Sequence, residues 1–216
     1  MARYEIPRGP GAGAVMDSKS VLKGALTVVR QTLKARGFAA KGTRFHRRTE
    51  SGNTEILSFQ KSVKSTSSEV LLTINYGVYS ACVGTKLGDD PSASLHVEEA
   101  HWRKRLRESG REKWLLVKAT DSVNECAKAI LSALDGVLLE LHAHAENEQL
   151  RDTWLAGQSP GIGRMQRLLF LAILVKQLGP ADRLRDVVAE LRQLVSGSVH
   201  AGLVDRQLKM AGIQGQ

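Results

Sequence analysis

The feature that most constrains the fold is a ten-residue run in which apolar and mostly polar side chains alternate. The apolar set is Val70, Leu72, Ile74, Tyr76 and Val78, and the other set is Leu71, Thr73, Asn75, Gly77 and Tyr79. Successive side chains of a strand point to opposite faces, so this period of two predicts a strand with one buried face. Such a strand is typical of an antiparallel sheet whose second face meets water. That wet face is a potential binding surface.

A helix and a hairpin are predicted before this strand. Asp17 or Ser18 can cap a helix whose apolar residues recur at spacings of four, three and four. These residues are Leu22, Leu26, Val29 and Leu33. Gly37 is suited to end that helix. Two β-rich runs, 43–50 and 54–62, flank a Ser-Gly-Asn turn and therefore predict a β-hairpin.

The rest of the chain reads as mainly helical. We expect a loop over 84–93, a short helix over 95–108 with Trp102 on its inner side, and a fourth strand over 114–117. A capping-box pattern, Ser122-x-x-Glu125, opens a long helix. After a Pro- and Gly-containing break at 158–163, two amphipathic helices separated at Gly179-Pro180 predict an antiparallel hairpin.

These elements predict an α+β fold. We expect an antiparallel sheet of about four strands packed on helices, followed by a C-terminal helical hairpin. The expected organisation is a flexible N-terminal segment over 1–16, an α+β domain over 17–157 and a helical C-terminal extension over 158–216.

The charge is uneven along the chain. Residues 1–118 hold 21 Lys and Arg against 11 Asp and Glu, whereas the remaining residues hold 10 against 11. The net charge of +9 therefore belongs to the first half. A basic surface suits an acidic partner, either nucleic acid or an acidic protein face, although a solvated basic surface without a partner is the alternative.

Membrane and secretory classes are not favoured. The most apolar run, residues 168–175, has eight residues, and about 20 are needed to span a bilayer. The N-terminus lacks the continuous apolar stretch of a signal peptide. The two cysteines, Cys82 and Cys126, lie far apart in apolar patterns, which favours a reducing compartment. We expect a cytoplasmic protein with no membrane partner and leave its oligomeric state open.

Motifs for catalysis, metals and cofactors are missing. The sequence has no HExxH, CxxC, GxSxG or GxxxxGK[ST] pattern. His142-x-His144 would direct its two rings to nearly opposite sides of a helix. We therefore assign no catalytic residue, no metal site and no cofactor. A hydrolase built on Asp89, Asp90, His96 and His101 is kept as a third class.

Six short motifs occur in a characteristic order. They are Leu33-x-x-x-Gly37-Phe38, Phe45 with Arg47, Phe59-Gln60-Lys61-Ser62, Ile74-Asn75-Tyr76-Gly77-Val78, His101-Trp102-Arg103-x-Arg105 and Lys113-Trp114. Together they resemble a bacterial family catalogued as domain of unknown function 4304, over about residues 20 to 155. The resemblance carries no catalytic residue with it. It implies a small stand-alone protein with a binding role, placed near toxin-immunity or defence genes.

The leading hypothesis is a non-enzymatic interaction protein, acting as a toxin-immunity or phage-defence accessory factor. Its partner is expected to be another protein that contacts the polar sheet face and the adjacent basic residues. The predicted contact residues are Gln60, Thr73, Asn75, Tyr79, Arg44, Arg47, Arg48, Arg103, Arg105 and Arg107. The alternative is a nucleic-acid-binding protein that uses the basic first half, with the same arginines on phosphates. Trp102 and Trp114 are expected in the core rather than on a base-stacking surface.

Overall fold

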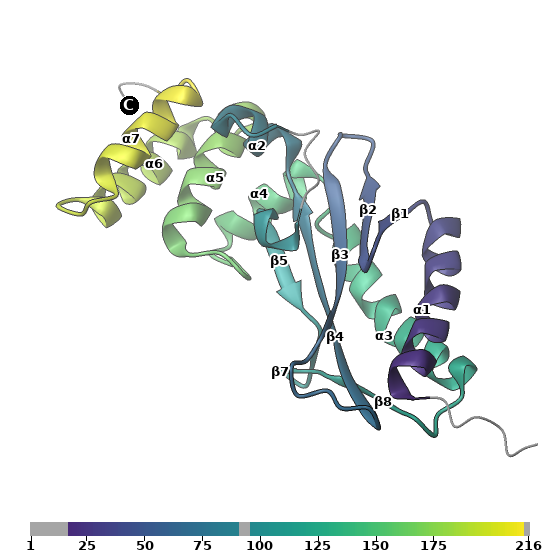
Figure 1. Ribbon diagram of the computed structural model, residues 1–216. Coiled ribbons are helices and arrows are strands. Elements are labelled where there is room, and N and C mark those ends of the chain that lie inside the picture. Colours follow the sequence, from purple (N-terminus) through teal and green to yellow (C-terminus); the bar gives the residue numbers. More distant parts are fainter. Residues whose placement is uncertain (1–16, 91–95, 214–216) are drawn as a thin grey trace, which may run out of the picture.

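The computed structural model describes residues 17–90 and 96–213. An antiparallel sheet forms the centre of the molecule, and two long helices, α1 (Ser18–Ala35) and α3 (Val123–His142), cover one of its faces (Figure 1). The strands follow the order β1 (Ala39–Lys41), β2 (Arg44–Arg48), β3 (Thr54–Lys61), β4 (Glu69–Tyr79) and β5 (Trp102–Arg105), and β8 (Leu115–Lys118) also pairs with β4. The sequence from 1 to 16, predicted to be flexible, lies outside the described residues.

β4 organises the sheet. It pairs with β3 from Thr54↔Tyr79 to Lys61↔Leu72 on one side. On the other side, the C-terminal part of β4 (75–78) pairs with β5 and its N-terminal part (69–72) pairs with β8. The apolar set of the alternating run is buried, as predicted, and packs toward α1 and α3.

The helix boundaries follow local capping chemistry. Asp17 accepts a hydrogen bond from the Ser20 amide at 2.7 Å and so caps α1. Gly37 adopts φ +85° after the helix, where the Phe38 amide bonds to the Leu33 carbonyl at 3.0 Å. Ser122 and Glu125 form the predicted capping box of α3.

The segment between β4 and α3 differs from the prediction. The helix expected over 95–108 is wrong: the described part holds a short 3-10 helix, η1 (Val97–Glu99), followed by β5 and a small hairpin, β6 (Arg107–Glu108) and β7 (Arg111–Glu112). The physical reason is that the free side of β4 at 75–78 takes up residues 102–105 as a partner strand. The loop expected over 84–93 contains the end of a further helix, α2 (Ala81–Leu87), which Ser80 caps. Residues 91–95 lie outside the description.

The α+β class is confirmed, with more elements than predicted. Within the described ranges the main sheet has six strands rather than about four, because β1 and β5 were not foreseen. The chain after α3 forms α4 (Asn147–Leu155), α5 (Arg164–Leu178), α6 (Asp182–Val195) and α7 (Ala201–Met210). α5 and α6 form the expected pair, and α4 and α7 are additional helices.

The helical tail shares its core with the sheet. The run Leu168–Val175 is buried throughout, because α4, α6, α7 and α2 surround α5. Trp154 and Phe170 contact each other there, and a single apolar cluster extends from the sheet to these residues. None of the helices in the described ranges combines the length and apolarity that a bilayer crossing requires.

Candidate interaction surface

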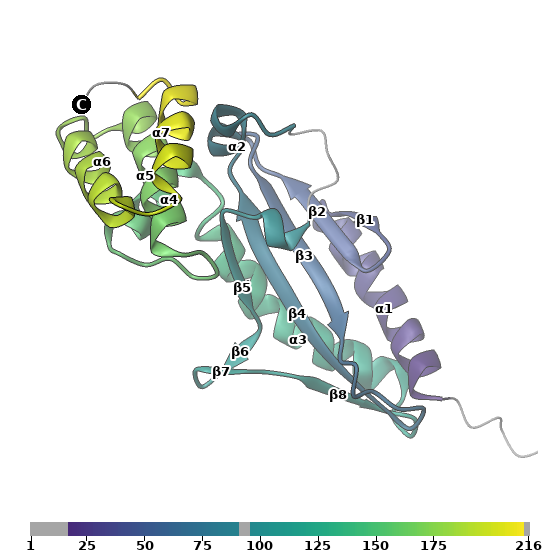
Figure 2. The same ribbon diagram turned by 60° about the vertical axis from the view of Figure 1, so that its left-hand side comes forward.

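The sheet has one face that α1 and α3 do not cover, and we call it the open face. Figure 2 shows β3, β4 and β5 in front, with both helices behind them. The cross-strand register places Ser58, Asn75 and Arg105 side by side on this face, whereas Leu57, Tyr76 and Lys104 point toward the helices. Arg44, His46, Gln60 and Arg103 belong to the open face by the same alternation.

Three predicted contact residues meet at the centre of the open face, and we call them the polar cluster: Gln60, Asn75 and Arg105. Asn75 Nδ2 donates to Gln60 Oε1 at 2.8 Å, and Arg105 Nε donates to Asn75 Oδ1 at 2.8 Å. Arg105 Nη2 also donates to Gln60 Oε1 at 3.3 Å. Neighbouring strands β3, β4 and β5 supply one residue each, so the sheet fixes the spacing of the cluster.

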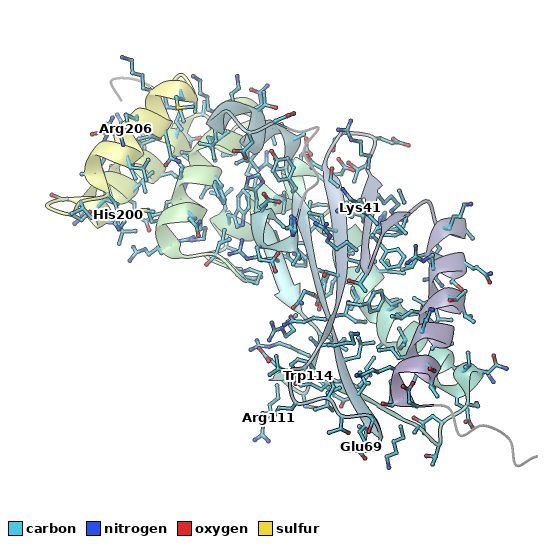
Figure 3. All side chains as sticks on the ribbon, viewed as in Figure 1. Lys41, Glu69, Arg111, Trp114, His200 and Arg206 are labelled. Carbon is cyan, nitrogen blue, oxygen red and sulfur yellow. The ribbon has the colours of Figure 1, made fainter. Side chains whose placement is uncertain are left out.

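The β6–β7 hairpin and the segment that follows it add two residues, Glu112 and Trp114, that the sequence did not single out for this site. Glu112 accepts from Arg105 Nη1 at 3.1 Å. Trp114 is half-buried, with the Arg105 guanidinium 6.0 Å from its ring centroid. Figure 3 shows Trp114 near Arg111 at the end of the molecule away from the tail residues His200 and Arg206. The prediction that Trp102 is core holds, because it is fully buried and stacks on His144. The same prediction for Trp114 is wrong, because Trp114 is only half-buried.

Thr73 and Tyr79 lie on the open face but are buried, so their expected exposure is wrong. Thr73 Oγ1 donates to the Lys113 carbonyl at 2.9 Å, because the chain leading into β8 crosses that end of the face. Tyr79 packs with Ile56 and with η1, which covers the other end. Burial, helped by the charge of Asp89, raises the pKa of Tyr79 to about 12.

Arg47 has a structural position rather than a surface one. It points toward the helices, where its Nε and Nη2 donate to the two carboxylate oxygens of Glu55 at 2.5 and 3.0 Å. Glu55 is 1% exposed. The Arg47 guanidinium also lies 4.6 Å from the Phe38 ring centroid and donates to the Arg36 carbonyl. Its charge is therefore largely committed inside the protein.

The other predicted arginines are spread over several elements. Arg44 Nη1 donates to His96 Nε2 at 2.7 Å. Arg103 Nη1 donates to the Glu98 and Ala100 carbonyls and so holds η1 against the sheet. Arg48 is exposed at the end of β2, and Arg107 is exposed on β6, opposite Glu112. The arginines thus do not form one continuous basic patch.

A groove of about 750 Å³ follows the outer edge of β5 beside α3. Lys104 Nζ and the Tyr76 hydroxyl both donate to Glu140 Oε2, at 2.9 and 2.8 Å. Burial alone would raise the pKa of Glu140, but these two hydrogen bonds outweigh it and the pKa lies below its usual value. Burial and the Glu140 contact raise the pKa of Tyr76. Glu140, Tyr76 and Lys104 are thus hydrogen-bonded to one another within the groove.

Three of the four residues considered for hydrolysis, Asp89, Asp90 and His101, line one pocket of about 480 Å³. His101 is buried between Tyr79 and Phe170, and its Nδ1 accepts from the Ser80 amide at 3.0 Å. Burial, with a contribution from Arg103, lowers the pKa of His101 to about 3, so the ring is neutral. Its Nδ1 already accepts the Ser80 hydrogen bond and is therefore not available to accept a proton from a substrate. His96 instead contacts Arg44. Across the described chain, no group of three or more His, Cys, Asp or Glu side chains could hold a metal.

The fold and the open face define a class: an α+β protein whose antiparallel sheet has one helix-covered face and one polar face. A family model described as "Domain of unknown function (DUF4304)" matches residues 29–144, more than half of the chain, and the chain belongs to this family. The matched range contains the whole sheet and the polar cluster, and α4 to α7 follow it. No curated protein and no solved structure matches the chain.

Proposed function

We propose that this protein is a non-enzymatic interaction protein that binds a partner protein through the open face, centred on the polar cluster. The observation that carries the proposal is that Gln60, Asn75 and Arg105 are hydrogen-bonded to one another before any partner arrives. A preorganised cluster loses less side-chain entropy on binding than three independent side chains would. It therefore suits recognition.

The chemistry of the cluster indicates what the partner surface offers. Arg105 uses three of its N–H groups within the protein, and the Gln60 amide nitrogen has two N–H groups. Donors are thus in excess over acceptors, which favours carbonyl or carboxylate groups on the partner. Trp114 lies beside Arg105, and Trp and Arg are enriched among the residues that dominate binding energy. The biological setting we propose is toxin immunity or phage defence.

The test uses the full chain as bait in an extract of the source cells. The wild type is compared with Arg105→Glu, with Gln60→Arg, and with Arg206→Glu as a control of the same charge change in the tail. Thermal unfolding first establishes that all four proteins fold. We expect one protein to be retained by the wild type and by Arg206→Glu and lost from the two open-face variants. The purified partner should then bind Arg105→Glu at least about tenfold more weakly.

Two results would contradict this proposal. One is retention of the same partner by all four baits, which would place the interface elsewhere. The other is failure of the folded wild type to retain any protein at micromolar bait concentration, which would remove the interaction function itself.

Nucleic-acid binding is the second candidate, and the β6–β7 hairpin favours it. Arg107 and Arg111 are exposed there, and Arg111 lies near Trp114 (Figure 3), a combination that suits phosphates and a stacked base. Glu108 and Glu112 lie opposite these arginines in the hairpin, and their negative charges disfavour phosphate binding. Fluorescence anisotropy with labelled single-stranded and duplex DNA should then show an affinity that falls steeply between 50 and 200 mM salt. An affinity that does not change with salt would exclude this candidate.

A further inference from the structure

A second groove lies on the helix-covered side of the molecule, between the first half of α1 and the end of β3. Its volume is about 510 Å³. It opens where β2 begins, since the Phe59 amide bonds to the Thr43 carbonyl and β3 continues beyond that point without β2 beside it. Apolar side chains line its floor: Leu22, Leu26, Phe59 and Leu72. We call it the α1 groove.

Four cations and no acidic side chain line the α1 groove. The cations are Lys19, Lys23, Arg30 and Lys61. Nine ion pairs occur elsewhere within residues 17–90 and 96–213, but none joins these four side chains to a carboxylate. Arg30 is held by a hydrogen bond from Nη2 to the Gly42 carbonyl at 2.7 Å, and the three lysines are exposed. The groove therefore has a positive rim above an apolar floor, and the Asp17 carboxylate interacts electrostatically with one of its cations, Lys19.

The geometry of α1 places the positive rim and the apolar floor of the groove side by side. Lys19, Lys23 and Arg30 are separated by four and seven residues, so they share one stripe of α1. The apolar residues Leu22 and Leu26 form the neighbouring stripe, which turns toward the sheet. The cationic stripe spans about 16 Å at the helical rise of 1.5 Å per residue. The cations therefore follow one side of the groove, and the apolar floor lies next to them.

We propose that the α1 groove binds a single-chain amphipathic anion: an alkyl chain with a carboxylate head. The apolar floor would bury the chain, and the carboxylate would relieve the mutual repulsion of the cations on the rim. The volume lies within the range of about 300–1,000 Å³ that small-molecule sites occupy. This site is independent of the open face, which lies on the opposite side of the sheet.

The experiment titrates the full-length protein with 11-(dansylamino)undecanoic acid and follows the dansyl fluorescence. We expect saturable micromolar binding to the wild type. Lys19→Glu/Lys23→Glu reverses two rim charges and should weaken binding at least about tenfold, because a carboxylate would then face like charges. Both sites are exposed, and Glu is as good a helix former as Lys and is favoured in a first turn, so α1 should remain folded.

A matched control makes the same charge change away from the groove. Lys128→Glu/Lys209→Glu alters two exposed lysines on α3 and α7 and should bind the probe like the wild type. 11-(Dansylamino)undecanol, which keeps the chain but lacks the carboxylate, should bind at least about tenfold more weakly than the acid. The proposal is overturned if the wild type does not bind the acid, if Lys19→Glu/Lys23→Glu binds it unchanged, or if the alcohol binds equally well. None of these outcomes bears on the open-face interaction.

Discussion

The ion pair between Arg47 and Glu55 gives the sharpest test of the structure. Replacing Arg47 by methionine keeps most of the aliphatic stem but removes the guanidinium. Glu55, with 1% exposure, would lose both hydrogen bonds that satisfy its carboxylate. Breaking a buried pair by removing one partner destabilises a protein by about 3–5 kcal/mol, because an uncompensated charge is left inside. The lost contact with Phe38 adds about 0.5–1 kcal/mol.

Arg47 is partly open to solvent, which reduces this cost. Its side chain is 30% exposed, so water could enter beside Glu55 in the variant. We therefore expect Arg47→Met to lower the free energy of unfolding by about 3 kcal/mol, the lower end of the range. That is a large part of the roughly 5–15 kcal/mol that stabilises a typical domain.

Urea unfolding at pH 7, followed by circular dichroism, measures this loss. Lys41→Met, an exposed position on β1, is the matched control and should change the free energy by less than about 0.5 kcal/mol. The double variant Arg47→Met/Glu55→Leu should recover more than half of the loss, because it removes the orphaned charge. A loss below about 1 kcal/mol in Arg47→Met, or no recovery in the double variant, would refute this account of the pair.

Three further predictions concern His101, two glycines in helices and the cap of α3. His101 has a folded pKa of about 3 against an ordinary value near 6.5, so its stabilising contribution is lost as pH falls from 6.5 toward 3. By pH 4 this loss is about 3 kcal/mol, and urea unfolding at pH 7, 5 and 4 should show a correspondingly smaller acid dependence for His101→Gln; an unchanged dependence would contradict it. A Cβ at Gly84 would lie 1.7 Å from the Tyr79 hydroxyl oxygen, so Gly84→Ala should cost at least about 1–3 kcal/mol. Gly136→Ala, with open space, should instead stabilise α3 by about 0.5–1 kcal/mol, and calorimetric midpoints that move the same way for both would disprove this. Ser122→Ala removes the α3 cap and should cost about 1 kcal/mol in urea unfolding, whereas no change would mean that water replaces the cap.

The sequence predicted the faces of β4 well but not what covers them. Alternation alone placed Ile74 in the core and Asn75 on the other face, because the period of a strand is fixed by its backbone. The same pattern could not show that η1 covers Tyr79 or that the chain before β8 crosses Thr73. Which segment packs over a strand face depends on residues far away in the sequence, and a local pattern carries no information about them.

The error at 95–108 has a related cause. Arg and Lys are good helix formers, and the stretch around Arg103 and Lys104 therefore favours a helix locally. Its strand conformation comes from pairing with β4, which is a tertiary effect. Glu112 and Trp114 were missed for the same reason: they reach the polar cluster only because the chain reverses at Ser109 and Gly110. Arg105 was predicted as a contact residue because it is basic, although the strand that carries it was not predicted.

The way in which β5 and β8 share one side of β4 has a consequence for how relatives can diverge. The chain leaves that side after Leu106 and returns at Leu115, and the turn between β6 and β7 points outward. Insertions at this turn would leave both strand registers and the core intact. The hairpin flanks the polar cluster through Glu112 and Trp114. Length variation at this one loop would therefore reshape the surface beside the polar cluster and leave the strands that position Gln60 and Asn75 unchanged.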